Sequence, residues 1–218
     1  MDVFSIRNNH FSGRSRLVLA GAAADIDEIT AEVVRKAIHF IIALAPVIAA
    51  FNRPLTVFVL MAGTLGYTWM ETLRLAGGQI PFVSFLTRMA SRDRDRGRFV
   101  MGPVTLGMGA LLALLFYPSP AASIGIYALA FGDGFASLVG KLFGVLRPRF
   151  LCGKSIEGSL ACFIAVLIAA YRVSSSVRIA FIAAFTATAV EALPLADYDN
   201  LALPVTVGLA VQLAFLPL

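Results

Sequence analysis

Residues 120–143, PAASIGIYALAFGDGFASLVGKLF, form the stretch that decides the fold. A helix of this length can cross the ~30 Å hydrocarbon core of a bilayer, which requires about 20 mostly apolar residues. Asp133 and Lys141 are the only charged residues within it. The stretch lacks the alternation of polar and apolar residues that a membrane-barrel strand shows, so the predicted element is a transmembrane helix.

Similar apolar stretches recur along the whole chain. Of its residues, 59% are hydrophobic and 14% are charged, whereas a soluble domain carries roughly 25% charged residues. The mean hydropathy is +0.84. We therefore predict an all-α fold, a polytopic transmembrane helical bundle of about seven spans, with residues 32–218 as a single transmembrane domain. The other six predicted spans are 37–51, 54–73, 99–117, 158–171, 177–193 and 201–217.

The basic residues are distributed unequally between the two sides that alternating spans define. Five lie in residues 1–39, six in 71–98 and four in 141–155, which makes fifteen on one side, against Arg53, Arg172 and Arg178 on the other. By the positive-inside rule, this asymmetry predicts a cytoplasmic N-terminal segment, 1–31, and a C-terminus outside. The net charge of +5 therefore indicates membrane topology and not nucleic-acid binding. We expect an integral protein of a prokaryotic plasma (inner) membrane.

The connection over residues 77–98 is the longest between two predicted spans. Residues 82, 85, 86 and 89 are apolar and share one helical face, which predicts a short helix in the membrane interface. The charged run SRDRDRGR (91–98) follows it. Before the first span, residues 27–30 (DEIT) predict a helix start. Neither Cys152 nor Cys162 has a partner at a spacing that predicts a disulfide or a zinc site.

Ionisable side chains lie within or beside several predicted spans, where each costs about 2.5–3.5 kcal/mol. Glu32, Arg35, Lys36 and His39 share one face of the first helix. Asp133 lies deep in its span between two glycines, and no basic residue is adjacent to it in the sequence. With the predicted topology, all these residues fall at the cytoplasmic face. So do Glu71, Arg74, Gly102, Lys154, Ser155, Glu157, Glu191, Asp199 and Asn200.

This combination of charges favours a site for phosphate and a metal ion. Phosphoryl transfer depends mainly on positioning and charge neutralisation. Asp133 and Asp199 have the hard oxygen ligands that Mg²⁺ prefers. Lys154 lies at a predicted helix start, where backbone N–H groups already attract anions. Pro148 stands where the nucleotide-binding Walker A loop requires a glycine, so that loop is excluded.

Simpler interpretations remain for the individual residues. Arg35, Lys36 and Arg74 could be interface anchors whose charged ends reach toward water. Gly140 and Gly144 form a GxxxG pattern, which is typical of close helix packing. A small transporter in which Asp133 and Glu191 carry protons is the alternative outside the enzymes.

Six motifs in order resemble one enzyme family. They are RKxxH (35–39), ExxR (71–74), GP (102–103), GDxxAxxxGxxxG (132–144), KSxEGS (154–159) and ExxxxxxxDNxxxP (191–204). Together they resemble the dolichol kinase and phytol kinase family, which are CTP-dependent polyprenol and lipid-alcohol kinases. The resemblance covers residues 32–204, and its most specific part is GDxxA followed by KSxEG.

The resemblance implies transfer of the γ-phosphate of CTP to a membrane-embedded alcohol, such as a polyprenol, dolichol or phytol, by a single transmembrane kinase domain. It implies that Asp133 and Asp199 hold Mg²⁺, and that Lys154, Ser155 and Glu157 bind and orient the nucleotide as catalytic residues. Asp133 or Glu191 could accept the proton of the alcohol. The remaining residues expected to bind CTP are Arg35, Lys36, His39, Glu71, Arg74, Gly102, Gly132, Gly153 and Asn200.

The GD…KSxEG core is also distantly similar to phosphatidate cytidylyltransferases, which attach CMP to a lipid phosphate. Their later GHGGxxDRxD-type signature is missing, and only Asp199 and Asn200 stand in its place. The kinase interpretation is therefore preferred, with the cytidylyltransferase and a kinase acting on diacylglycerol as alternatives. The partners expected are the lipid substrate, the nucleotide and the bilayer.

Overall fold

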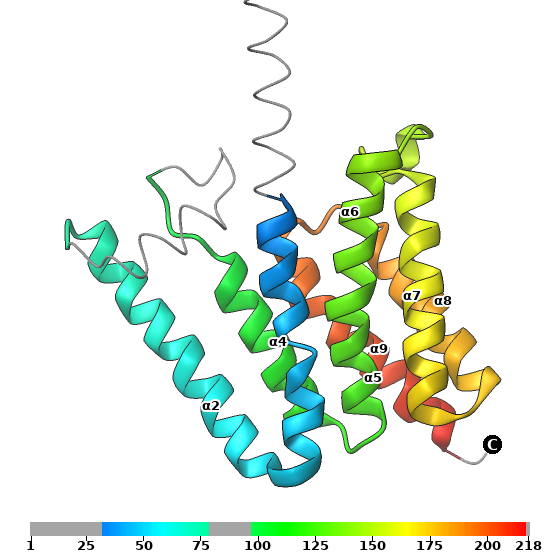
Figure 1. The fold of residues 1–218 in the computed structure, drawn as a ribbon, viewed down its shortest axis with the longest axis horizontal. Helices are drawn as coiled ribbons and strands as arrows, with labels where there is room; N and C mark the ends of the chain where they lie inside the picture. The colour runs from blue at the N-terminus through cyan, green and yellow to red at the C-terminus, as the bar shows by residue number, and fades with distance from the viewer. Residues whose placement is uncertain (1–31, 79–96, 217–218) are drawn as a thin grey trace, which may run out of the picture.

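The computed structural model describes residues 32–78 and 97–216, and all regular secondary structure there is helical (Figure 1). The predicted all-α fold is therefore confirmed. The N-terminal segment 1–31 with its helix-start motif, the predicted interfacial helix and most of the charged run at 91–98 lie outside the described residues.

The first two predicted spans form a helical hairpin. Residues 32–41 are helical, and after two turn residues α2 extends over Leu44–Leu75. Asn52, with φ −152° and ψ 90°, interrupts α2, and the chain reverses there (Figure 1). The Asn52 side chain accepts a hydrogen bond from Leu55 N at 3.0 Å, which caps the returning segment. The boundary predicted between 37–51 and 54–73 thus coincides with this break.

The remaining predicted spans also lie in helices. They are α4 (Gly102–Phe116), the continuous series α5 (Ala121–Tyr127), η2 (Ala128–Asp133) and α6 (Gly134–Phe143), then α7 (Ile156–Ser174), α8 (Val177–Glu191) and α9 (Asp199–Phe215). Short 3-10 helices, η3 (Arg149–Leu151) and η4 (Ala196–Tyr198), lie in two of the connections. α4, the continuous series α5–η2–α6, α7, α8 and α9 run in alternating directions, and the segments before α4, after α6 and after α8 lie at one end of the bundle (Figure 1).

The described residues contain three helices long and apolar enough to cross a membrane: Glu32–Leu75, Ala121–Phe143 and Ile156–Ser174. The chain is therefore a helical membrane protein. The first of the three includes the reversal at Asn52, and α4 is a shorter apolar helix.

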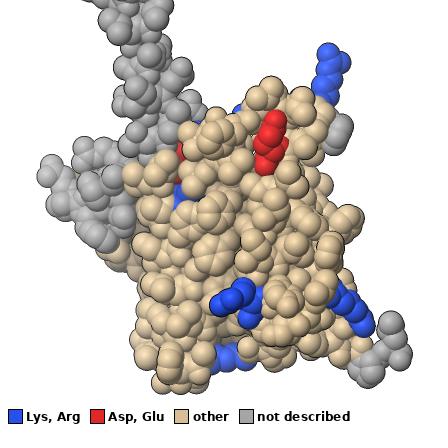
Figure 2. Space-filling model, turned by 45° about the vertical axis from the view of Figure 1, so that its right-hand side comes forward, with Lys and Arg blue, Asp and Glu red and all other residues tan. Residues whose placement is uncertain are grey.

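The surface and the interior have the distribution of side chains that lipid favours. Large apolar side chains such as Phe51 (88% exposed), Trp69 (68%) and Phe185 (72%) point outward. Figure 2 shows a broad belt without charged side chains on the face that it displays. The buried positions are rich in alanine instead, among them Ala113, Ala121, Ala170, Ala183 and Ala187. Small residues at the contacts let the helices approach closely, which is how membrane helices pack in the absence of a hydrophobic effect between them.

The glycines beside Asp133 serve this close packing. A Cβ on Gly132 would lie 2.8 Å from the Val166 side chain of α7, and one on Gly134 would lie 2.6 Å from the ring of Phe40. Asp133 itself ends η2, a π-helical turn that the sequence did not predict. π-Helical turns of this kind are frequent at functional sites. Two neighbouring helices thereby come close to the Asp133 carboxylate.

Close packing of α5 on α9 is tested by a pair of glycine substitutions. A Cβ on Gly125 would lie 2.5 Å from the carbonyl oxygen of Pro204, whereas one on Gly63 would have no atom within 4 Å. We expect Gly125→Ala to destabilise the protein by about 1–3 kcal/mol, because α9 must move away. Gly63→Ala should leave stability unchanged or raise it by up to about 1 kcal/mol. Thermal unfolding of both variants in detergent measures the difference, and equal midpoints would contradict the packing described.

Candidate functional site

A buried ion pair lies at the centre of the site. Lys36, on the helix over residues 32–41, donates through Nζ to Oδ2 of Asp133. His39 Nδ1 lies 3.1 Å from the same oxygen. Lys36 is 3% exposed and Asp133 is 8% exposed, so each charge depends on the other for compensation. The sequence predicted that both residues belong to one site, but it did not predict that Lys36 is the partner of Asp133.

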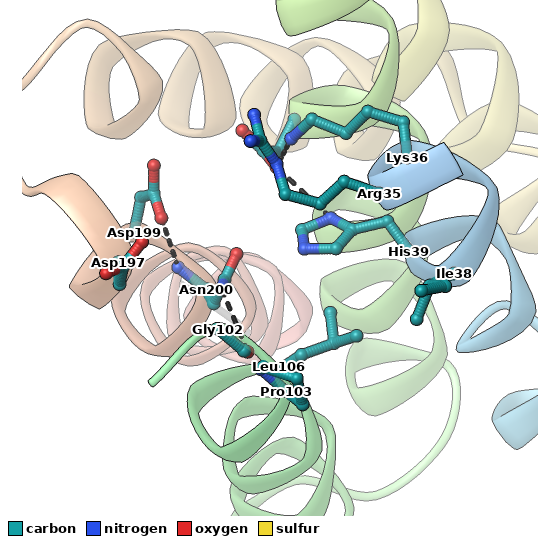
Figure 3. Close-up of a pocket in the computed structure, with 11 residues that line it drawn as sticks. Arg35, Lys36, Ile38, His39, Gly102, Pro103, Leu106, Asp197, Asp199 and Asn200 are labelled. Carbon is teal, nitrogen blue, oxygen red and sulfur yellow. Dashed lines mark hydrogen bonds and ion pairs between the residues drawn. The ribbon is translucent and has the colours of Figure 1, made fainter. Parts of the chain in front are cut away.

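Asp133 lies between two cavities. The first, here called the α4 cavity, has a volume of about 40 Å³ and is shown in Figure 3. Asp197, in η4, and Asp199, at the start of α9, approach it opposite Arg35 and His39 (Figure 3). Its lining residues are Arg35, Lys36, Ile38, His39, Gly102, Pro103, Leu106, Asp133, Asp197, Asp199 and Asn200.

The second cavity, here called the α7 cavity, has a volume of about 170 Å³ and lies at the start of α7. It shares three lining residues, Lys36, Asp133 and Asp199, with the α4 cavity. The others are Ala136, Ser137, Gly140, Lys141, Arg147, Gly153, Lys154, Ser155, Gly158 and Glu191. Residues of five motifs distant in the sequence are thus brought together around two adjoining cavities.

Lys154 and Glu191 meet at the α7 cavity, as the sequence predicted for two residues of one site. Lys154 Nζ lies 3.2 Å from Glu191 Oε1 and also donates to the Glu191 backbone carbonyl. Ser159 Oγ donates to Glu191 Oε2 at 3.2 Å. Glu191 ends α8 and Lys154 precedes α7, so this pair ties the two helices together at the site.

Ser155 has a clear structural role beside its place in the cavity lining. Its Oγ accepts a hydrogen bond from Gly158 N at 3.1 Å and so caps α7. A Cβ on Gly140 would lie 3.1 Å from the same Oγ, and one on Gly144 would lie 2.6 Å from it. The GxxxG pattern therefore packs α6 against the start of α7, in agreement with the simpler interpretation of those glycines.

The loop between α6 and α7 is held by two side chains. Glu157 accepts hydrogen bonds from Val145 N and Leu146 N, both at 3.1 Å, and it is not among the lining residues of either cavity. Arg147 donates to the carbonyls of Gly140 at 2.7 Å and Gly153 at 2.8 Å. Gly153 has φ +92°, a conformation that favours glycine. Arg147 lines the α7 cavity and was not predicted, because a single loop arginine has no distinguishing pattern.

Glu71 and Arg74 lie elsewhere, at the end of α2. Arg74 binds both carboxylate oxygens of Glu71, at 2.7 and 2.8 Å, and Glu71 Oε1 accepts from Val100 N at 3.0 Å. Arg74 also donates to the carbonyl of Arg98 at 3.1 Å. Neither residue lines either cavity. The arrangement attaches the segment before α4 to α2. Gly132, also expected to bind CTP, likewise contacts the Val166 and Cys162 side chains instead of a cavity.

Glu32 is a member of the site to which the sequence assigned no role. It is 1% exposed and accepts hydrogen bonds from Arg35 and from Ser137 Oγ. Lys141 Nζ lies 3.3 Å from its Oε2. Arg35 lines the α4 cavity and Lys141 lines the α7 cavity. One buried carboxylate thus orients a cation toward each cavity.

Asp199 and Asn200 close the site from the start of α9. Asp199 Oδ1 accepts from Asn200 N at 2.8 Å, and Asn200 Nδ2 donates to Thr105 Oγ1 at 3.0 Å on α4. Burial and the nearby Asp133 carboxylate raise the pKa of Asp199, which precedes the apolar stretch of α9, to about 6. Lys36 and Lys154 offset part of the repulsion between the two carboxylates, and a further cation near both would relieve the rest.

The donor set is compatible with a magnesium ion brought in by a nucleotide. Among residues 32–78 and 97–216, no cluster of three or more His, Cys, Asp or Glu is arranged for a metal. Mg²⁺, however, usually takes only one or two carboxylates and completes its coordination with water and substrate phosphates. Asp133 and Asp199, which both line the two cavities, satisfy that requirement.

The position of Glu71 predicts that its substitution acts on stability. Glu71→Gln should weaken the contacts with Arg74 and Val100 N, and hydrogen bonds to a charged group contribute roughly 1.5–3 kcal/mol each. We expect a lower midpoint of thermal unfolding in detergent and little change in nucleotide affinity. A variant of normal stability that no longer binds nucleotide would instead support the sequence-based assignment of Glu71 to the CTP site.

Comparison with known proteins gives three relevant relatives. A probable phytol kinase of Triticum aestivum is 30% identical over 148 residues, which are 60% of this chain and 49% of that protein. Phytol kinase 1 of Arabidopsis thaliana is 28% identical over 151 residues, 61% of this chain and 49% of the relative. A CTP-dependent diacylglycerol kinase of Eremothecium gossypii is 39% identical over 57 residues, 26% of this chain and 18% of that protein.

The chain thus spans about half the length of the phytol kinases that it matches. Both plant relatives are named chloroplastic, so they give no support to the expected prokaryotic plasma membrane. No protein-family model and no solved structure matches the chain. The resemblance found in the sequence motifs is confirmed: the chain is a relative of the phytol kinases and of a CTP-dependent diacylglycerol kinase, and so resembles the CTP-dependent lipid kinases.

Proposed function

We propose that this protein is a CTP-dependent kinase that phosphorylates a membrane-embedded isoprenoid alcohol of the polyprenol, dolichol or phytol type. The observation that carries the proposal is the meeting of Lys36, Asp133, Lys154 and Asp199 around two adjoining cavities at one end of an apolar bundle. Such a site can neutralise phosphate charge while the hydrocarbon of the substrate stays in lipid. The names of the relatives support the same activity.

The reaction requires an acceptor oxygen, a phosphorus atom and a leaving group in line. The alcohol oxygen attacks the γ-phosphorus of CTP, the bond from that phosphorus to the oxygen bridging to the β-phosphate breaks, and CDP leaves with the electron pair. The hydroxyl proton passes to a carboxylate. Lys154 and Lys36 line the α7 cavity, where they would offset the negative charge of CTP. Asp133 and Glu191 are the two candidates for the proton acceptor, because both line the α7 cavity.

Asp133 and Asp199 would hold Mg²⁺ together with the phosphates. When bound, the ion would supply positive charge to the phosphate oxygens during transfer. Ser155 and Gly153, which line the α7 cavity, would shape the nucleotide pocket around Lys154. Glu157 would act indirectly, by holding the loop that carries Lys154.

The membrane arrangement belongs to the same proposal. The seven apolar stretches would each cross the bilayer once, and the site would lie at the cytoplasmic face, beside the fifteen basic residues, with the N-terminus on that side. A protease that cuts an N-terminal tag only from the side where CTP is consumed would support this orientation.

A kinase acting on diacylglycerol is the second candidate. The relative from Eremothecium gossypii, named for that activity, is 39% identical over its 57 matched residues. The alcohol of diacylglycerol could reach the same site, since its hydrocarbon chains would also remain in lipid.

Labelled CTP separates the candidates. Purified protein with Mg²⁺ is given CTP labelled in the α- or γ-phosphate, together with polyprenol, phytol or diacylglycerol in mixed micelles. We expect label in the lipid only from γ-labelled CTP, and more with the isoprenoid alcohols than with diacylglycerol. Label from the α-position, with phosphatidate as acceptor, would indicate a cytidylyltransferase. No label in any lipid would refute the enzymatic proposal.

Asp133 gives the sharpest single-residue test of the mechanism. Asp133→Asn should lower kcat by roughly 100-fold or more, because it removes a proton acceptor and a metal ligand. Asp197→Asn makes the same change at a residue that lines only the α4 cavity, and it should cost much less. Gel filtration and thermal unfolding check that both variants fold. Rates like the wild type in folded Asp133→Asn would remove Asp133 from the mechanism.

A further inference from the structure

The α4 cavity has two kinds of wall. Lys36, Asp133 and Asp199 form a polar wall, at the boundary with the α7 cavity. Ile38, Pro103 and Leu106 form an apolar wall on the helix over residues 32–41 and on α4 (Figure 3). Leu106 lies one helical turn further from the charged end than Gly102. The cavity thus extends from the charged end of the bundle into its apolar layer.

The α7 cavity differs in both size and lining. It is the larger of the two. Lys141, Arg147 and Lys154 face it, and the only apolar side chain in its lining is that of Ala136. Such a space suits a chain of phosphates, whereas the smaller and partly apolar α4 cavity suits a hydroxyl group and the carbons next to it.

From this difference we infer that the α4 cavity is the acceptor subsite and binds the hydroxyl end of the lipid alcohol, while the α7 cavity binds the triphosphate of CTP. The inference rests on the proposed function and adds to it the place of each substrate. The two substrates would meet at Lys36, Asp133 and Asp199, the residues that both cavities share. Ile38, Pro103 and Leu106 would contact the first carbons of the alcohol, and the remaining chain would lie in the bilayer.

Gly102 makes the acceptor subsite accessible to a test. It lines the α4 cavity, and a Cβ at this position would meet no atom within 4 Å. A Cβ at this position therefore strikes no neighbour, and a larger side chain there would alter the lining of the cavity. Gly63 on α2 offers a matched control, because its Cβ would also meet nothing within 4 Å and it lines neither cavity.

The experiment compares Gly102→Leu, Gly63→Leu and Lys141→Gln with the wild type in mixed micelles, varying CTP and phytol separately. For Gly102→Leu we expect the KM for phytol to rise roughly tenfold or more, with the KM for CTP nearly unchanged. Lys141→Gln should show the reverse pattern, and Gly63→Leu should match the wild type. Binding of labelled CTP without acceptor provides a second readout, which Gly102→Leu should retain even if its turnover is too slow to measure.

Each outcome decides one question. A Gly102→Leu variant that turns over phytol normally, or that loses CTP binding while its thermal unfolding is normal, would overturn the acceptor assignment and leave the kinase proposal standing. A wild-type protein that transfers label to no alcohol would overturn the proposed function and this inference together. A higher KM for phytol alone in Gly102→Leu, together with a higher KM for CTP alone in Lys141→Gln, would support separate cavities for the two substrates.

Discussion

The contact between Lys36 and Asp133 is the constraint on which the site depends. Two charges that are almost fully buried, on helices far apart in the chain, compensate each other inside an otherwise apolar bundle. Removing one partner of such a pair costs roughly 3–5 kcal/mol, because the other charge stays buried without compensation. The first helix must therefore lie against the helix of Asp133, and the surrounding residues serve that approach. Gly134 admits the ring of Phe40, and Glu32 joins the first helix to Ser137 and Lys141.

Small residues extend this arrangement through the rest of the bundle. Gly109, Gly125 and Gly208 lie so close to Asn200, Pro204 and Tyr117 that a Cβ on any of them would overlap these neighbours. The same contacts fix the start of α9, from which Asp199 faces the two cavities. The packing of the helices therefore also determines where the charged groups of the site lie. A change at a helix contact far from Asp133 can displace a carboxylate of the site.

Much of the fold could be predicted from the sequence. A helix that crosses the hydrocarbon core must be mostly apolar over about 20 residues, so apolar stretches mark the helices directly. The predicted gap at Asn52 and Arg53 separated the first two stretches where α2 breaks. The sequence predicted seven membrane crossings, whereas three helices among the described residues are long and apolar enough to cross a membrane. The π-helical turn at residues 128–133 could not be predicted, since no residue pattern distinguishes it from an ordinary α-helix.

The site was predictable only at the level of which segments meet. Asp133, Lys154 and Asp199 line one cavity, as expected from the motifs and the charge topology. The sequence could not show that Glu71 and Arg74 line neither cavity, because an ion pair three residues apart has the same pattern whether it faces a cavity or a loop. The partners of each charge depend on tertiary contacts, and those of Lys36 and Glu32 became known only from the structure.

The separation of Lys36 and Asp133 by 97 residues also bears on how the protein is made. A ribosome delivers the first hairpin to the membrane long before the carboxylate that will neutralise Lys36 has been synthesised. During that interval the ammonium group must remain at the lipid–water boundary, which its long side chain allows. Final seating of the first helix against its partner therefore has to wait until the residues around Asp133 have been synthesised.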